Sequence, residues 1–305
     1  MDLRSSDGAR VDRGLLLILT PVLWGATFPA AKLALDTLTP LALMTWTRGL
    51  GLVTLLLVLP WAARSQRIRK LELRALVAPG LGLGGLLFAG YTLQTVGLRY
   101  TTATNAGFIT GLYVVITPLL GALLFREMPR RSLWIAVALS VAGLALLSTS
   151  SLVSFTPHSG DLLVLLGAFA WAGHVVALGR LARVYPTLLL AAAQLAGATL
   201  LHAAATIPVG FEVGDALGIV PLLIVTGVLG TGVAYTLQIV AQQDLSAART
   251  AVILSGESLV AALLSVVWIG ERLLAHQWLG AALILGAMVL SETSARRGAA
   301  APAVP

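Results

Sequence analysis

Cysteine is absent from this chain of 305 residues, and charged residues are scarce. The lack of cysteine excludes disulfide scaffolds, thiolate metal sites and cysteine nucleophiles. Asp, Glu, Lys and Arg make up 11% of the residues, compared with about 25% in soluble domains. Hydrophobic residues make up 58%, and the mean hydropathy is +0.92. This composition excludes an ordinary soluble domain and favours a protein whose solvent is the lipid bilayer.

Patterns for nucleotides, metals and nucleic acids are missing as well. No Walker A motif occurs, the four histidines show no H-x-x-x-H spacing, and no acidic cluster provides a metal cage. Gly80, Gly82 and Gly85 satisfy G-x-G-x-x-G, but no βαβ unit surrounds them, so we expect close helix packing there. The net charge of +7 comes from basic residues in short gaps between apolar runs, which does not indicate nucleic-acid binding. No cofactor or metal is expected.

Apolar runs that are long enough to cross a hydrocarbon core of about 30 Å follow one another along the chain. The predicted spans are 14–35, 40–60, 75–98, 101–125, 132–149, 160–182, 187–208, 217–240, 249–269 and 277–291. The sequence thus predicts an all-α polytopic membrane protein of about ten transmembrane helices.

Basic residues are unevenly divided between the two sides of these spans. If odd-numbered spans run outward from the cytoplasm, all but four of the 20 Lys and Arg residues lie on the cytoplasmic side. Lys32, Arg99 and Arg272 lie on the other side, and Arg48 lies within the second span. We therefore expect residues 1–13 and 292–305 to be cytoplasmic tails, with the first span a retained helix and not a signal peptide. The Ala-, Leu- and Arg-rich composition favours a bacterial cytoplasmic membrane.

An internal repeat covers nearly the whole chain. The string Tyr-Thr-Leu-Gln at 91–94 recurs at 235–238, an offset of 144, and the same offset carries Trp134 onto Trp278. At a similar offset Trp24 falls on Trp171. The repeats are predicted at 14–149 and 160–291, with five spans in each. An odd number of spans inverts the second copy in the membrane, an arrangement that favours alternating access to a midplane site.

Several motifs resemble those of one membrane protein family. They are Trp24-Gly25, Arg48, the stretch Asn105-Ala106-Gly107-Phe108, Pro118, Glu127, Glu257, Gly270-Glu271 and Gln277-Trp278-Leu279-Gly280. Together they resemble the EamA-type members of the drug/metabolite transporter superfamily over roughly Gly14 to Leu290. The family often has a proline after the glutamate of its ninth helix, where this chain has Ser258, so a kink is better supported at Pro118.

The resemblance implies a secondary transporter and not an enzyme. Members are commonly exporters of small metabolites such as amino acids, with a central cavity lined by the first four helices of each half. The alternatives are a permease for nucleosides, vitamins or cationic drugs, an intramembrane lipid-modifying enzyme, and a non-transporting receptor. The expected partners are a small-molecule substrate and the lipid bilayer, with proton coupling through Glu257 as a hypothesis.

Glu257 is the one acidic residue of 13 that lies deep within a predicted span. A carboxylate at that depth costs about 2.5–3.5 kcal/mol, so we expect a proton or substrate-cation site there, or a structural residue held by Ser255 and Ser258. Arg48 lies at a depth that differs by only about 6 Å. An ion pair between the two, or joint contact with a zwitterionic substrate, is the resulting hypothesis.

Uncharged residues complete the set of candidates. Tyr and Gln three residues apart share a helix face, so these pairs either line a cavity or join helices. We expect the two repeated tryptophans to form a cavity wall or a packing platform, and Glu127 to pair with Arg126, Arg130 or Arg272. The cavity-lining candidates are Tyr91, Gln94, Tyr235, Gln238, Trp24 and Trp171, with Asn105, Thr110, Tyr113, Gln194 and His174 as weaker ones.

Overall fold

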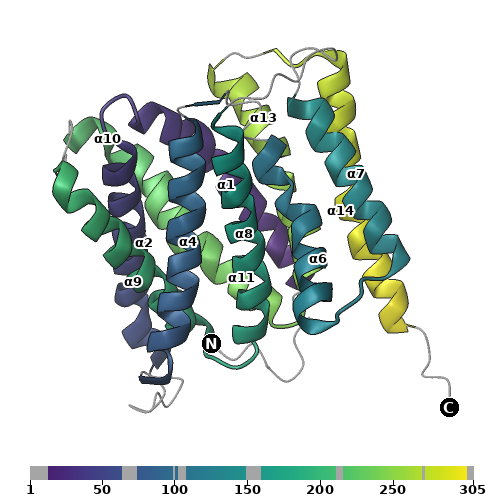
Figure 1. Cartoon of the computed structure of the whole chain (residues 1–305), viewed down its shortest axis with the longest axis horizontal. Helices are drawn as coiled ribbons and strands as arrows, with labels where there is room; N and C mark the ends of the chain where they lie inside the picture. The colour runs from purple at the N-terminus through teal and green to yellow at the C-terminus, as the bar shows by residue number, and fades with distance from the viewer. Residues whose placement is uncertain are drawn as a thin grey trace.

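The computed structural model describes residues 13–63, 74–98, 100–101, 108–148, 159–210, 216–269 and 272–300. Every regular element within these ranges is helical, and Figure 1 shows the helices packed side by side in a bundle. Eight helical segments among the described residues are long and apolar enough to cross a membrane. The chain is therefore an all-α polytopic membrane protein.

The helices follow the order of the two repeats. The first repeat contains α1 (Arg13–Ala34), α2 (Pro40–Ala63), α4 (Val77–Leu98), α6 (Tyr113–Phe125) and α7 (Arg131–Ser148). The second contains α8 (Asp161–Leu181), α9 (Thr187–Thr206), a composite span, a broken span and α14 (Ala275–Ala300). The composite span joins α10 (Ala216–Leu223), the π-helical segment η2 (Ile224–Val233) and α11 (Ala234–Gln242), and the broken span joins α12 (Ala247–Leu254) and α13 (Gly256–Ile269).

The predicted spans agree with these helices at most boundaries. The first span, predicted at 14–35, is α1, and the seventh, predicted at 187–208, is α9 followed by the short η1 (Ile207–Val209). The fourth, predicted at 101–125, is helical from residue 108 onward, and 102–107 lie outside the described residues. α14 extends to residue 300 instead of 291, because polar residues end an apolar run without ending a helix.

Helix packing reflects a two-fold relation between the repeats. α1 packs on α13 and α11, and its counterpart α8 packs on α6 and α4. α4 packs on α9, just as η2 packs on α2. The counterparts α2 and α9 pack on each other, as do α7 and α14. Each contact recurs when every helix is exchanged for its counterpart, as expected for a pseudo-two-fold axis between inverted repeats.

Two large clusters of buried apolar side chains form the interior, and each draws on both repeats. The α4 lobe joins α2, α4, α9 and α11 around residues such as Leu190. The α6 lobe joins α6, α7, α12 and α14 around residues such as Ile284, with α13 packed against it. Trp24 of α1 and Trp171 of α8 pack against both clusters. Both helices also supply buried members of the clusters, Leu17 and Ala168 in the α6 lobe and Leu178 in the α4 lobe. α1 and α8 therefore pack against both lobes, neither of which is a single repeat.

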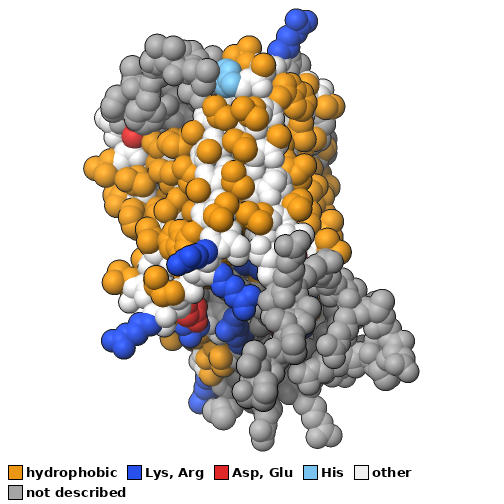
Figure 2. Space-filling model, turned by 90° about the vertical axis from the view of Figure 1, so that its right-hand side faces the viewer, with side chains coloured by type: hydrophobic (Ala, Val, Ile, Leu, Met, Phe, Trp, Pro, Cys, Tyr) orange, Lys and Arg blue, Asp and Glu red, His pale blue; other side chains and the backbone are white. Residues whose placement is uncertain are grey.

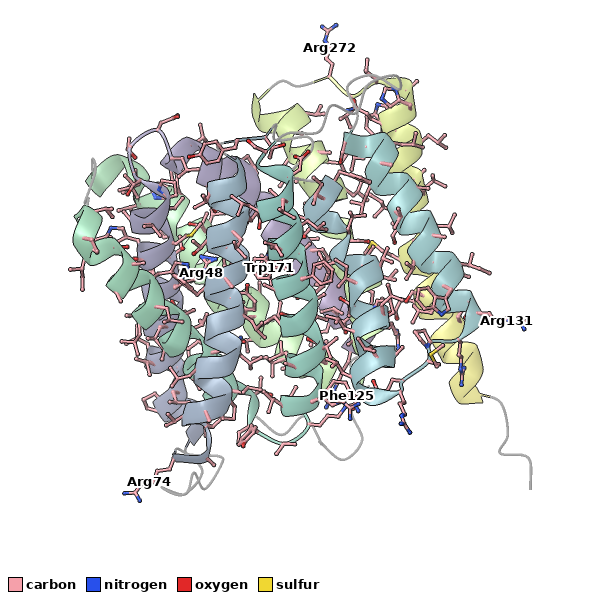
Figure 3. The ribbon with its side chains drawn as sticks, in the orientation of Figure 1. Arg48, Arg74, Phe125, Arg131, Trp171 and Arg272 are labelled. Atoms are coloured by element: carbon pink, nitrogen blue, oxygen red, sulfur yellow. The ribbon has the colours of Figure 1, made fainter. Side chains whose placement is uncertain are left out.

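The outer surface is apolar along its length and basic at one end. Figure 2 shows hydrophobic side chains over most of the described part of one face, with Lys and Arg gathered towards its lower end. Figure 3 places Arg74 at that end, called the basic end below, and Arg272 at the opposite end. Leu57 and Leu123 are 74% and 77% exposed, which fits a surface that faces lipid.

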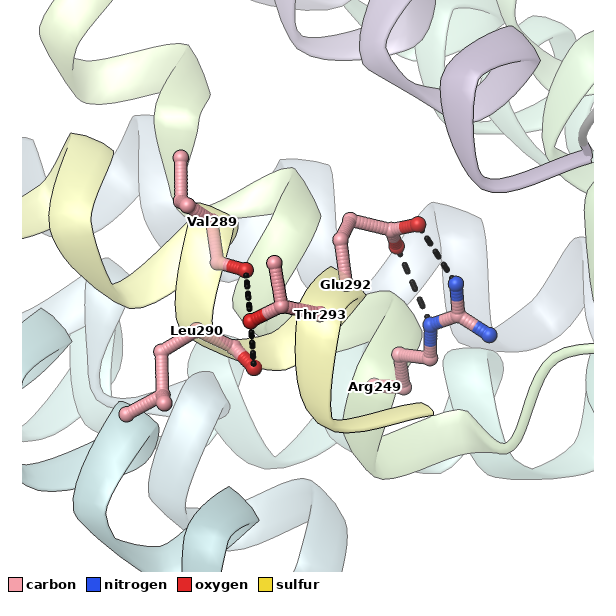
Figure 4. Close-up of polar contacts among 5 residues, drawn as sticks. All are labelled: Arg249, Val289, Leu290, Glu292 and Thr293. Atoms are coloured by element: carbon pink, nitrogen blue, oxygen red, sulfur yellow. Dashed lines mark hydrogen bonds and ion pairs between the residues drawn. The ribbon is translucent and has the colours of Figure 1, made fainter. Parts of the chain in front are cut away.

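An ion pair links α12 to α14 near the basic end. Arg249 donates from Nε to Oε1 of Glu292 at 3.0 Å and from an Nη atom to Oε2 at 2.5 Å (Figure 4). The side chains are 19% and 10% exposed. This two-pronged geometry is the strongest form of the arginine–carboxylate contact.

Glu127 pairs with a residue that we did not expect. Its carboxylate lies 2.6 Å from Arg180 at the end of α8, and among the described residues it forms no ion pair with Arg126, Arg130 or Arg272. Arg126 has a φ of 57° and ends α6, while the Arg180 guanidinium also stacks on Phe125. The pairing therefore depends on how α6 and α8 pack, which sequence neighbours do not reveal. Glu271, its repeat counterpart, lies outside the described residues.

Glycines allow close helix approach at some of the expected positions. A Cβ at Gly80 would lie 2.7 Å from Ala193 of α9, so close packing is confirmed there. Gly82 and Gly85 have open space around them, and that part of the prediction is wrong. α7 and α14 approach closely at Gly143 and Gly280, because a Cβ on either would lie within 2.7 Å of the other's carbonyl oxygen.

Candidate functional site

Tyr91 and Tyr235 meet in the interior at the boundary between the two repeats. Their hydroxyl oxygens are 3.0 Å apart, so one donates a hydrogen bond to the other, and their positions differ by the repeat offset of 144. A contact between two counterparts must lie on the axis that exchanges them. The pseudo-two-fold axis therefore passes close to this hydrogen bond.

The repeated tryptophans flank the tyrosine pair. Trp171 packs edge-on against Tyr91, with ring centroids 4.5 Å apart, and Trp24 packs edge-on against Tyr235 at 5.1 Å. Both tryptophans are partly exposed within the bundle. The four rings form one chain across the axis, and each tryptophan contacts a tyrosine of the other repeat.

The indole N–H groups break this symmetry. Trp171 donates to Oε1 of Gln94 at 3.2 Å, whereas Trp24 donates to the backbone oxygen of Gly230 at 2.8 Å. Gly230 belongs to η2, and π-helical turns occur often at functional sites. Gln238, the counterpart of Gln94, is fully buried, and both polar atoms of its side chain lack a partner.

Arg48 of α2 projects onto the same group of rings. Its guanidinium carbon lies 3.5 Å from the centroid of the Tyr91 ring, and one Nη atom donates to Thr47 at 2.6 Å. The residue is 5% exposed, and its Nε has no hydrogen-bond partner. Figure 3 shows Arg48 and Trp171 at the same height, midway between the two ends of the bundle.

Glu257 and Tyr113 are also counterparts, since 257 minus 113 is 144. Each follows a break in its span: Leu112 precedes α6, and Ser255 separates α12 from α13. Glu257 lies in the first turn of α13, where the positive end of the helix dipole favours a carboxylate. It is near enough to Tyr113 and Tyr235 to interact electrostatically with both.

The carboxylate of Glu257 has no hydrogen-bond or ion-pair partner among the described residues, and its side chain is partly exposed. The hydroxyl of Ser255, which we expected to hold it, donates to the backbone oxygen of Val252 at 2.7 Å instead. Arg48 forms no ion pair with Glu257 in this part of the chain either, so direct pairing is not a feature of this conformation.

His174 and Gln194 are bonded to each other. The imidazole Nε2 lies 2.9 Å from Oε1 of Gln194, and the ring packs edge-on against Tyr235 with centroids 5.7 Å apart. Both residues are at least 99% buried. This arrangement is consistent with a structural polar pair packed against Tyr235. A proton relay through His174 stays a prediction.

The remaining candidates divide by where they lie. Asn105 is outside the described residues. Thr110 is buried, and its hydroxyl has no partner. Pro118 lies within the continuous helix α6, and the interruption of that span is at Leu112 instead, so a kink at Pro118 stays a prediction. No group of three metal-ligating side chains occurs in the ranges that the structure covers.

Two features of the site were not predicted from the sequence. One is the Gly230 backbone carbonyl that accepts the Trp24 hydrogen bond, and the other is that Tyr113 and Glu257 occupy equivalent positions in the two repeats. The cluster Gly227, Gly230 and Gly232 was the available signal for the irregular segment η2. The offset of 144 would have aligned Tyr113 with Glu257, but a search for identical residues passes over counterparts of different type.

Comparisons with known proteins place this geometry in context. A family model described as the EamA-like transporter family matches residues 13–149 and 158–293. A protein named an uncharacterized transporter in Archaeoglobus fulgidus is 33% identical over 283 residues, which cover 92% of this chain and 86% of that protein. The threonine/homoserine exporter RhtA of Salmonella typhimurium is 30% identical over 257 residues, 81% of each chain. A crystal structure with 20% sequence identity has the same fold, with a TM-score of 0.79 over 95% of this chain and 99% of that one.

Proposed function

The chain belongs to the EamA-like transporter family, and on that premise we propose that it is a secondary exporter of a small zwitterionic metabolite, such as an amino acid. The relative named as a threonine/homoserine exporter supports this substrate class. The observation that carries the proposal is a pair of opposite, unpaired charges on the two lobes, with aromatic rings between them.

The α4 lobe contributes the cation and the α6 lobe contributes the anion. Arg48 has an Nε without a partner, and Glu257 has no partner among the described residues. A charge inside a membrane span costs about 2.5–3.5 kcal/mol on insertion scales, so an unpaired one needs a compensating role. A zwitterion would present its carboxylate to Arg48 and its ammonium group to Glu257, which would join the lobes.

This arrangement supports a proposal of alternating access. The bundle has two packed lobes that α1 and α8 join, and we propose that the lobes are the bodies that rock in the cycle. We further propose that Glu257 takes up a proton when substrate leaves it, since an empty carboxylate in a span is costly. Flux that does not vary with pH, in the wild type and in Glu257→Gln alike, would remove the coupling proposal.

Transport assays in proteoliposomes test the substrate class. We expect flux of amino acids but not of nucleosides, vitamins or cationic drugs, and a loss of at least about tenfold in Arg48→Gln and Glu257→Gln, which is about 1.4 kcal/mol. Arg74→Gln and Asp36→Asn remove the same charges from exposed positions and serve as matched controls. A transported amino acid should also raise the melting temperature of the wild type. Transport of a nucleoside or a drug without any amino acid would overturn the proposal.

The basic end is proposed to face the cytoplasm of a bacterial cell, with both termini on that side. The excess of Lys and Arg at this end supports the orientation. Because the chain has no cysteine, a single Arg74→Cys or Arg272→Cys variant can be labelled directly. An impermeant maleimide applied to intact cells should label position 272 and spare position 74. The reverse pattern would refute the orientation.

A further inference from the structure

A cavity opens at the basic end, apart from the cluster of aromatic rings. It has a volume of about 540 Å³, within the range of about 300–1,000 Å³ that is usual for ligand pockets. We call it the basic pocket. Its walls come from α6, α7, α12, α14 and the loops beside them, and they include Thr117, Met128, Arg130, Arg183, Arg249 and Ser291.

Two helix N-termini contribute first-turn residues to the basic pocket. α7 begins at Arg131 and α12 at Ala247, and neither has an acidic residue in its first turn. The first N–H groups of a helix have no partner within the helix and carry the positive end of its dipole. The Ser246 hydroxyl caps α12 by accepting a hydrogen bond from the Arg249 N–H at 3.3 Å, which satisfies one of its first N–H groups. Neither helix has a carboxylate to balance the positive end of its dipole, which favours an anion at this wall.

Unpaired arginines add to this positive potential. Arg130 and Arg183 are exposed pocket residues that form no ion pair with a described residue. The other charged wall residues are neutralised, because Arg249 is paired with Glu292, and Glu127 with Arg180. The pocket thus keeps two free positive charges.

Buried hydroxyl groups in the walls point independently to a polar ligand. Thr117 is fully buried and Ser291 is 3% exposed, yet neither hydroxyl has a hydrogen-bond partner. Both residues line the pocket. An unsatisfied buried hydroxyl is costly, and an anion oxygen in the pocket would accept the hydrogen bond from each.

We infer that the basic pocket binds the phosphate group of an anionic phospholipid. The lipid source is favoured over a soluble phosphate because the rim continues into lipid-facing surface. Met128 lines the pocket and is 75% exposed, and Leu124 on the last turn of α6 is 61% exposed. Figure 2 shows the basic side chains directly below the broad apolar surface of this face. Basic pockets between membrane helices bind anionic head groups in this way.

Native mass spectrometry of the purified full chain tests the inference. Phosphatidylglycerol should bind more tightly than phosphatidylcholine with the same acyl chains. In the double variant R130Q/R183Q the affinity for phosphatidylglycerol should fall by about 10- to 30-fold, because each lost arginine removes about 1 kcal/mol of binding free energy. The control R74Q/R272Q removes the same two charges elsewhere and should bind like the wild type. Ser291→Ala keeps every charge and should weaken binding about threefold through the lost hydroxyl.

Competition with soluble phosphate compounds distinguishes a lipid phosphate from a free phosphate as the ligand. Glycerol 1-phosphate and inorganic phosphate should compete with phosphatidylglycerol only at far higher concentrations, since they lack acyl chains. Equal binding of the two lipids, or full binding by R130Q/R183Q, would overturn the inference. Glycerol 1-phosphate or inorganic phosphate binding as tightly as the lipid would overturn the lipid assignment. The readout is binding and not flux, so it stands apart from the proposed export activity.

Discussion

Buried polar side chains near the aromatic rings divide into those that have partners and those that lack them. The hydroxyls of Tyr91 and Tyr235 bond to each other, and His174 bonds to Gln194. The hydroxyl of Tyr113 and the side-chain amide of Gln238 have no partner. Because a lipid core offers no water to satisfy such groups, unpartnered ones are costly and mark positions where a ligand or another conformation would complete the bonding.

The hydrogen bond between the two tyrosines should make a measurable but small contribution to stability. A double-mutant cycle of Tyr91→Phe and Tyr235→Phe is expected to give a coupling energy of about 0.6 kcal/mol, the average for membrane hydrogen bonds. Unfolding in mixed micelles measures it. Tyr185→Phe, whose hydroxyl donates to Ala75 elsewhere, should show no coupling with Tyr235→Phe. Equal coupling in both cycles would mean that the tyrosine contact has no specific energy.

At the scale of single residues, the sequence predicts how deep a side chain lies in the membrane but not which neighbouring helix it faces. Tyr91 and Tyr235 were selected because they are repeated, yet nothing in the repeat says that they touch, since the position of the axis is a property of helix packing. Similar depth was also the only basis for pairing Arg48 with Glu257. In the structure the Arg48 guanidinium lies over the Tyr91 ring. A hydropathy pattern does not indicate which neighbouring helix a side chain contacts.

At the scale of helices, the spans were predictable and their interruptions were not. A continuous apolar run identifies a crossing segment, because a helix is the element that satisfies its backbone in lipid. The breaks at Leu112 and Ser255 and the π-helical turns of η2 leave hydropathy unchanged. They occur at or beside the groups that form the candidate site. Local irregularity of this kind depends on tertiary contacts and so escapes a reading of apolar runs.

The crossing of α7 and α14 should be sensitive to a single methyl group. In Gly280→Ala the new Cβ would lie 2.6 Å from the Gly143 backbone oxygen, so the helices must separate, at a cost of about 1–3 kcal/mol. A lower midpoint of thermal unfolding is the expected result. Gly286→Ala, in the same helix with open space around its Cβ, is the matched control and should show no loss. Equal midpoints for the two variants would contradict the packing described for this pair.

At the scale of the whole molecule, the packed lobes differ from the duplicated units. The apolar clusters combine helices from both repeats into each lobe, so the duplicated units are not the packing units. The axis maps each lobe onto itself and exchanges α1 with α8. Exact symmetry would give Trp24 and Trp171 the same hydrogen bonds, and the structure departs from it. Such a departure is expected of a transporter held in one of two states, because exchanging the conformations of inverted repeats produces the other state.

This exchange predicts a switch of tryptophan hydrogen bonds during the transport cycle. In the opposite state Trp24 should donate to Gln238, the counterpart of Gln94. Trp171 should leave Gln94 for the backbone oxygen of Leu86, the counterpart of Gly230 (230 minus 144). Leu86 already lies close to α8, since a Cβ at Gly173 would be 3.6 Å from its side chain.

Two matched variants separate the states. Gln238→Leu removes an amide that has no partner in the present state, so it should raise the melting temperature while it slows transport. Gln94→Leu removes the acceptor of Trp171, so it should lower the melting temperature and favour the opposite state. Single cysteines introduced at each end of the bundle, read by their labelling rates, would report the two populations. If both variants shift accessibility in the same direction, the tryptophan bonds do not distinguish the states, and the proposed exchange between the repeats loses its structural basis.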